Sequence, residues 1–148
     1  MLIGPFLFPD ALHYLVDHQV WARLEEGGTA CVGITSLGMQ LAGGEVYMAR
    51  PKSVGAVVAQ GGSMAIVELA KSIVSVKSPV AGTVIAINER LAATPELVHR
   101  DPYGEGWLAR LRLADFAADA PGLVHGEDAV GPAMRAHARL HEMELGAP

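Results

Sequence analysis

Cysteine, lysine and aromatic residues are all scarce in this chain. A single cysteine, Cys31, excludes an internal disulfide, and we therefore expect a reducing compartment, the cytoplasm. No apolar stretch approaches the roughly eighteen residues of a membrane span, and no secretory leader pattern opens the chain. The formal net charge of -5 argues against a nucleic-acid surface, because phosphate binding needs clustered Lys and Arg. Neither a membrane nor a nucleic acid is expected as a partner.

Glycine and proline are plentiful by contrast, with 17 and 9 residues, and 51% of the chain is hydrophobic. This composition favours a compact, turn-rich β fold over a helical bundle. The length of 148 residues suits one domain with a sizeable core, and we expect a monomer. Within residues 1–148 the sequence predicts an irregular lead-in over 1–17, a β core over 18–113 and a C-terminal helical extension over 127–145.

Apolar residues on alternate positions predict a hairpin early in the core, from Val20 to Leu24 and from Thr29 to Ile34. Cys31 lies inside its second strand and is interpreted as a small buried hydrophobe. A short helix, 36–41, is expected to begin at a Thr35 cap.

Further elements are indicated by shorter patterns. A helical turn within 89–98 would be capped by Thr94, and the glycines of the loop 101–106 are expected to adopt positive φ. Additional strands are predicted at Glu45 to Ala49, Gly82 to Asn88 and Trp107 to Leu113.

The segment that stands out chemically is centred on Lys71, one of only three lysines in the chain. Two short β-prone runs, 64–67 and 73–76, flank it and are too close together for any connection but a hairpin. Lys71 is therefore predicted at or beside the tip, where its long stem and amine suit acylation by a modifying enzyme. No evident base for the amine proton lies nearby in the sequence, so Lys71 is interpreted as a substrate for modification and not as a catalyst.

Several runs around Lys71 occur in the order typical of a known family. Glu68-Leu69-Ala70-Lys71 is followed by Ser78-Pro79-Val80-Ala81-Gly82-Thr83-Val84. From Trp21 to Asp115 the chain resembles the glycine cleavage system H protein family, in which a glutamate stands three residues before the lipoyl-lysine and a Ser-Pro-Val-small-Gly turn follows. The other matching runs are Val32-Gly33-Ile34-Thr35, Asn88-Glu89-Arg90-Leu91, Pro95-Glu96-Leu97-Val98 and Asp101-Pro102-Tyr103-Gly104-Glu105-Gly106-Trp107-Leu108.

The resemblance implies a mainly β, lipoyl-domain-like barrel-sandwich hybrid of two small sheets with short helices and a C-terminal helix. It implies lipoate bound covalently to Lys71, and Glu68 as a residue recognised by the lipoyl-attaching enzyme. The protein would be a non-catalytic carrier without a metal, whose swinging arm takes an aminomethyl group from glycine decarboxylase to the aminomethyltransferase and is reoxidised by dihydrolipoamide dehydrogenase. Biotin is the rival attachment, but biotin carriers place methionine on each side of the lysine, where this chain has Ala70 and Ser72.

Departures from the family pattern leave other functions open. The family commonly shows His-x-Trp before its first strand, whereas this chain has His18-Gln19-Val20-Trp21. The opening 8–14 and the segment 51–55 look closer to H-like lipoate-binding proteins of the heterodisulfide-reductase-like sulfur-oxidising system. One alternative is therefore a lipoate-binding protein that carries sulfur intermediates to a heterodisulfide-reductase-like complex. Another is an unmodified H-like scaffold or regulatory binding module.

The remaining candidate residues have plainer interpretations. His137 and His141 lie four apart, a spacing that could bind zinc, but no third ligand is evident and a solvated helix face is favoured. Lys77 is interpreted as a solvated charge at a strand end. His13 and His18 could border the surface where a loaded arm docks. Trp21 and Trp107 are expected in the core.

Overall fold

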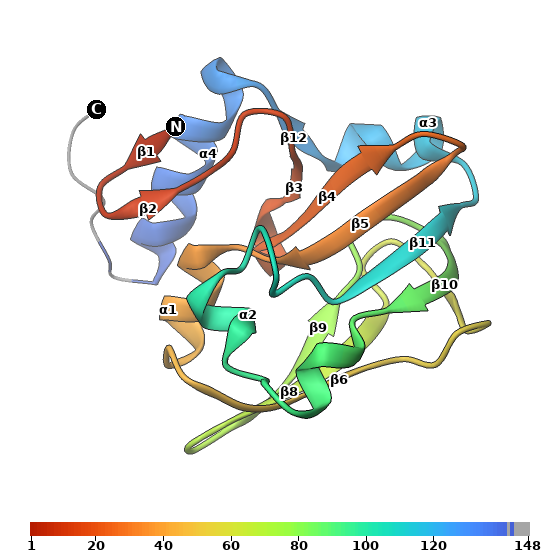
Figure 1. Ribbon diagram of the computed structural model, residues 1–148. Coiled ribbons are helices and arrows are strands. Elements are labelled where there is room, and N and C mark those ends of the chain that lie inside the picture. The colour runs from red at the N-terminus through yellow and green to blue at the C-terminus, as the bar shows by residue number, and fades with distance from the viewer. Residues whose placement is uncertain (142, 144–148) are drawn as a thin grey trace.

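Alternating apolar residues build this chain into three antiparallel sheets (Figure 1). The computed structural model describes residues 1–141 and 143. The strands are β1 Leu2–Ile3, β2 Phe6–Leu7, β3 His13–Leu15, β4 Val20–Glu25, β5 Thr29–Ile34, β6 Val46–Pro51, β7 Val57–Val58, β8 Ser63–Leu69, β9 Ile73–Lys77, β10 Gly82–Ile87, β11 Ala109–Leu113 and β12 Val124–His125. Seven form one sheet in the order β12-β3-β4-β5-β11-β10-β7, three form a second in the order β6-β8-β9, and β1 pairs with β2. The expected mainly β architecture is confirmed.

Helices are short except for the last. They are α1 Ser36–Ala42, α2 Leu97–Arg100, α3 Phe116–Asp119 and α4 Glu127–Leu140, with 3-10 helices η1 Val16–His18, η2 Glu89–Ala92 and η3 Ala120–Gly122. The predicted cap of α1 is confirmed, because the side chain of Thr35 accepts a hydrogen bond from the backbone N–H of Gly38 at 2.9 Å. The C-terminal helix covers 127–140 of the expected 127–145; residues 142, 144 and 145 lie outside the described residues.

Both faces of the β4–β5 hairpin are buried, in two separate hydrophobic clusters. Val20 and Val32 face the cluster shared with the three-stranded sheet, and Trp21 and Cys31 face a second cluster shared with α4. The alternation of strand side chains produces this division. Cys31 is fully buried, as predicted, and burial is the main reason why the pKa of its thiol is raised. The seven-stranded sheet therefore needs a cover on each side.

The lead-in over residues 1–17 supplies part of that cover, and the expectation that it would be irregular is wrong. It contains β1, β2 and β3, and Phe8 and Tyr14 are completely buried in the second cluster. The rings of Phe8 and Tyr14 meet edge to face, with centroids 6.0 Å apart, and the Tyr14 hydroxyl donates to the carbonyl of Pro9 at 2.7 Å. Figure 1 shows β1 and β2 alongside α4.

Two local predictions in the region 89–106 also need correction. Asn88, not Thr94, caps the first turn there, since its side chain accepts from the N–H of Arg90, and α2 begins without a side-chain cap. Gly104 and Gly106 do not adopt positive φ. They are needed for close approach instead: a Cβ on Gly104 would lie 2.5 Å from Oδ2 of Asp101.

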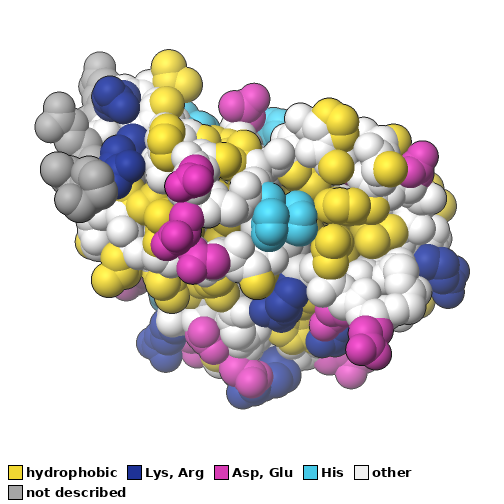
Figure 2. Space-filling view, turned by 90° about the horizontal axis from the view of Figure 1, so that it is seen from above, with side chains coloured by type: hydrophobic (Ala, Val, Ile, Leu, Met, Phe, Trp, Pro, Cys, Tyr) yellow, Lys and Arg dark blue, Asp and Glu magenta, His cyan; other side chains and the backbone are white. Residues whose placement is uncertain are grey.

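The surface carries charges of both signs. On the face seen in Figure 2, acidic and basic side chains are interspersed with hydrophobic ones and with histidines near the middle. Within the described part of the chain, no helix is long and apolar enough to cross a membrane.

Candidate functional site

Lys71 lies at the tip of the β8–β9 hairpin, which projects from the body at the lower left of Figure 1. The two strands pair antiparallel, with Glu68 opposite Ile73 and Val67 opposite Val74. The N–H of Leu69 donates to the carbonyl of Ser72 at 2.9 Å, so Ala70 and Lys71 form a two-residue turn. The predicted hairpin is confirmed, and Lys71 is exposed at its end.

Neither Lys71 nor Glu68 contributes to the packing of the hairpin. Glu68 is exposed on the side of β8 that faces away from the core. Its neighbours Val67 and Leu69 lie on the opposite side of the strand and are buried in the core. No ion pair among residues 1–141 and 143 includes either side chain. Both charged groups are therefore available to another molecule.

The Ser78–Gly82 motif has a structural role, because it fixes the base of the hairpin. Ser78 is buried, and its hydroxyl donates to the carbonyl of Val80 at 2.6 Å. The N–H of Ala81 donates to the carboxylate of Asp119 at 2.8 Å, and the amide of Gln60 donates to the carbonyl of Pro79 at 3.1 Å. Two distant segments, at Gln60 and Asp119, thus hold the chain directly after β9, so the base of the hairpin is anchored to the body.

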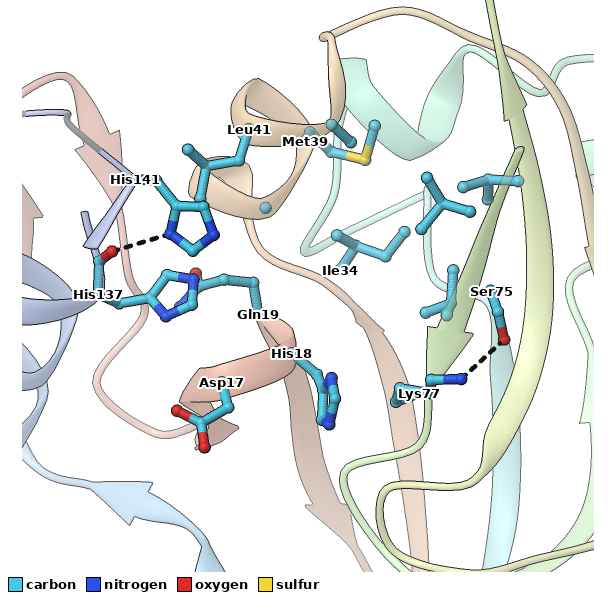
Figure 3. Close-up of a pocket in the computed structure, with 15 residues that line it drawn as sticks. Asp17, His18, Gln19, Ile34, Met39, Leu41, Ser75, Lys77, His137 and His141 are labelled. Atoms are coloured by element: carbon cyan, nitrogen blue, oxygen red, sulfur yellow. Dashed lines mark hydrogen bonds between the residues drawn. The ribbon is translucent and has the colours of Figure 1, made fainter. Parts of the chain in front are cut away.

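A cavity of about 300 Å³ lies beside β9, between that strand and the helices η1, α1 and α4 (Figure 3). Its apolar part includes Ile34 and Met39, and Ser75 and Lys77 lie on the β9 side. Asp17, His18, Gln19, His137 and His141 lie on the other side. These residues come from five separate parts of the chain, and the spacing of residues in the sequence does not reveal that they meet.

Gln19 builds one wall of this cavity. It is buried and adopts a left-handed φ of 52°, in the segment where the chain is longer than His-x-Trp. Its side-chain amide donates to the carbonyl of Val16 at 2.8 Å, and its side-chain oxygen accepts from the hydroxyl of Thr35 at 2.6 Å. The extra residue is therefore built into the turn that connects η1 to β4, directly after Asp17 and His18, and its side chain ties this turn to Thr35 at the start of α1.

Two histidines at the C-terminal end of α4, His137 and the capping residue His141, meet at the cavity edge. The rings of His137 and His141 have centroids 4.6 Å apart, and Nδ1 of His141 lies 3.1 Å from the carbonyl oxygen of His137. Burial, followed by the charge of His141, lowers the pKa of His137, whereas Asp17 opposes the shift. His137 is buried, so the interpretation of a solvated face holds only for His141. Among the residues that the structure describes, no group of three His, Cys, Asp or Glu side chains could hold a metal ion.

The structure separates the other sequence candidates. His18 lines the cavity, but His13 does not: its ring stacks on His125 of β12 at 3.9 Å. Lys77 lines the cavity, with its amine donating to the hydroxyl of Ser75 at 3.1 Å, and is therefore not simply a solvated strand end. Asp17 and Gln19 were not predicted as site residues, and their position immediately around His18 is the only sequence signal for them.

Known proteins match both the sequence and the fold. The family model described as "Glycine cleavage H-protein" matches residues 12–134. "Glycine cleavage system H protein 2" of Aquifex aeolicus is 39% identical over 124 residues, covering 84% of this chain and 76% of that protein. The "Glycine cleavage system H protein" of Marinobacter nauticus is 45% identical over 107 residues, covering 72% and 81%.

A solved structure extends the match to three dimensions. The crystal structure of a glycine cleavage system H protein from Mycobacterium marinum superimposes with a TM-score of 0.71 at 25% identity, covering 92% of this chain and 100% of that one. The fold is thus the lipoyl-domain-like barrel-sandwich type, without a closed barrel. The chain belongs to the glycine cleavage H-protein family.

Proposed function

We propose that this protein is a lipoyl carrier, modified on Lys71, that serves the glycine cleavage system without catalysing a step itself. The observation that carries the proposal is the position of Lys71, exposed at a two-residue hairpin tip in a chain of the H-protein family. The scarcity of lysine adds to it, since the only others are Lys52 and Lys77. We also propose that the protein is located in the cytoplasm and is a monomer.

The residues around Lys71 fit a covalently attached arm. The tip is open to an attaching enzyme, and the anchored Ser78–Gly82 segment keeps the base of the hairpin in place. A lipoyl amide on Lys71 would supply a dithiolane that can open to accept a group and close on reoxidation. Tethering on an arm of this kind holds the carried group at a local concentration in the millimolar range.

The cavity beside β9 lies within reach of such an arm. Val74 is three residues from Lys71, which at the strand rise corresponds to about 10 Å. The arm would reach about a dozen ångström. The cavity combines apolar walls with Asp17, Lys77 and three histidines, so it offers both burial and polar contacts to the arm and its load. Its volume is at the lower end of the usual range for small-molecule sites.

The partners that follow from this function are glycine decarboxylase, the aminomethyltransferase, dihydrolipoamide dehydrogenase and a lipoyl-attaching enzyme. The second candidate is the carrier of sulfur intermediates for a heterodisulfide-reductase-like complex. The cavity contains a single carboxylate, Asp17, opposite Lys77 and the three histidines, so it also admits an uncharged or anionic load.

Carbon exchange between glycine and bicarbonate tests the proposal. The protein, shown by intact mass to carry one lipoyl group, is mixed with a glycine decarboxylase from the same source, and a genuine H protein serves as control. We expect exchange near the rate of the control. No exchange from the lipoylated protein would contradict the glycine cleavage role and favour the sulfur carrier. A chain that never accepts lipoate would instead be an unmodified scaffold.

A further inference from the structure

We propose that the lipoyl-attaching enzyme docks on the outer face of the three-stranded sheet next to Lys71, with Ile73 as its main apolar contact. This surface, called the tip face below, consists of Arg50, Ile66, Glu68 and Ile73. The inference rests on the proposed modification of Lys71 and adds to it the surface by which the modifying enzyme recognises the chain.

The register of the sheet places these four side chains together. Glu68 lies opposite Ile73, and Ile66 lies opposite Arg50 on β6. Residues directly opposite in an antiparallel pair point to the same side of the sheet, and Ile66 is the diagonal neighbour of Ile73. All four residues are exposed, whereas the alternate positions of β8 are buried in the core.

The apolar character of this face is confined to the end nearest Lys71. Ile73 is 70% exposed and Ile66 is 43% exposed. Farther from the tip the same face becomes polar, because the hydroxyl of Ser75 donates to that of Ser63 at 2.9 Å and the amine of Lys77 donates to Ser75. Ile66 and Ile73, near the Lys71 end of the hairpin, contribute nothing to the described core. Core packing therefore does not explain why these two positions are apolar.

The position of the tip face selects the attaching enzyme among the possible partners. That enzyme must bring an activated lipoyl donor, an acyl adenylate, to Nζ of Lys71. Lys71 then loses a proton and forms the amide bond as AMP leaves. An interface of usual size buries about 800 Å² on each partner, so an enzyme placed over Lys71 also covers residues two or three positions away. Partners that act on the far end of the arm work about a dozen ångström beyond the lysine and need not touch this face.

The charges of the tip face define the surface that fits it. Glu68 has no ion-pair partner among residues 1–141 and 143, so a cation on the enzyme can pair with it. The exposed Ile66 and Ile73 call for an apolar recess beside that cation. Amide formation removes the positive charge of Lys71, whereas the carboxylate of Glu68, three residues away, keeps its charge. The attaching enzyme thus meets a different surface before and after the reaction.

Lipoylation rates of matched variants test this inference. The apo-protein is incubated with a lipoate–protein ligase, lipoate and ATP, and the initial rate is followed by intact mass. Ile73→Thr and Ile66→Thr keep the β-branched side chain that strands favour but remove much of the apolar contact. Val57→Thr is the matched control, since Val57 is 78% exposed on β7 of the seven-stranded sheet.

We expect kcat/KM for lipoylation to fall about tenfold in Ile73→Thr and about threefold in Ile66→Thr, the size of effect typical of a central and a flanking interface residue. Val57→Thr should match the wild type, and all melting temperatures should agree. Wild-type lipoylation rates in both isoleucine variants would overturn the inference. Normal lipoylation of Ile73→Thr with reduced carbon exchange would also overturn it, because the face would then belong to a later partner. If the wild type itself gains no lipoyl group, the proposed function fails first.

Discussion

The hairpins β4–β5 and β8–β9 show two uses of the same motif. Both are antiparallel, but the β8–β9 register shifts between Ser63 and Ala65, and β4–β5 lies inside the seven-stranded sheet between β3 and β11. Its two faces are buried against different clusters. The hairpin β8–β9 buries only one face, and β9 is an edge strand.

The turns of the two hairpins also differ. The β4–β5 turn contains Gly27 and Gly28, both at positive φ, which suit a tight connection and offer no side chain. The β8–β9 turn contains Ala70 and Lys71 and presents an amine. The first hairpin therefore contributes mainly to stability and the second mainly to function, and substitutions should separate the two roles.

The largest effect is expected at the tip. Lys71→Arg keeps a positive charge but removes the amine that forms the amide, so lipoylation should disappear completely while the melting temperature stays unchanged. Intact mass after incubation with a lipoyl-attaching enzyme measures this. Lys77→Arg, six residues farther along the chain, is the control and should still be lipoylated on Lys71 to the same extent as the wild type. A lipoyl adduct that persists in Lys71→Arg would show that the site is assigned wrongly.

The core hairpin should respond in the opposite way to Gly33→Ala. The new Cβ would lie 2.5 Å from Cζ2 of the fully buried Trp21. The Trp21 ring cannot easily move, since its indole N–H donates to the carbonyls of Ile34 and Pro102 at 3.1 and 3.2 Å. Overpacking of this kind costs about 1–3 kcal/mol.

Thermal unfolding measures this cost, which should lower the melting temperature by roughly 5–10 °C, while lipoylation of the folded fraction continues. Gly131→Ala in α4 is the matched control, because its Cβ meets only the end of the Arg135 side chain. An unchanged melting temperature for Gly33→Ala would refute the close contact with Trp21.

A smaller and more selective effect is expected from Glu68→Gln. This substitution removes a charge that has no ion-pair partner in the described chain, so the melting temperature should not change. If the attaching enzyme pairs a cation with Glu68, the lipoylation rate should fall about tenfold, in line with the loss of a charge-assisted contact. Glu26→Gln, at an exposed acidic position in the β4–β5 turn, should have no such effect. Equal rates would remove Glu68 from the recognition surface.

The smallest expected effect is a pH dependence of stability. It originates at His13 of β3, next to the edge strand β12 of the seven-stranded sheet. His13 stacks on His125 and meets Phe116 edge-on, and its buried Nδ1 has no hydrogen-bond partner among the described residues. Burial, and then the charge of His125, lower the pKa of His13 from 6.5. The unfolded chain therefore binds more protons, and stability is lost as the pH falls through about 6.5 toward the lower pKa of the folded state.

Melting temperatures between about pH 7.5 and about pH 5.5 should thus fall by a few degrees. His13→Phe keeps an aromatic ring without a titratable group and should reduce the slope, with a remainder from His137, whose pKa is also lowered. A slope identical to that of the wild type would assign the pH dependence to other groups. Lipoylation of Lys71 should not depend on the His13 substitution.

The two hairpins were predictable from sequence because their signals are local. Alternation and a short connection suffice for a hairpin, and both β4–β5 and β8–β9 appear where these patterns predict them. The Thr35 cap is local in the same way. The sequence motifs around Lys71 also indicated the H-protein family.

Features that depend on distant contacts could not be predicted. Strands of two or three residues, such as β1 and β3, exist only because they pair and because Trp21 needs cover on its side of the sheet. Gly104 looks like a turn glycine in sequence, yet its constraint comes from the Asp101 carboxylate. The cavity depends on η1, α1, β9 and α4 together, and Asp17 belongs to it only through that assembly.

The open edge of β9 has a consequence for the behaviour of the protein at high concentration. An edge strand offers backbone N–H and C=O groups that can pair with a second chain, which is a common route to aggregation. β9 is only five residues long and ends in a lysine, two features that discourage such pairing. The strand that borders the cavity proposed for the arm is therefore also a sheet edge open to pairing with a second chain.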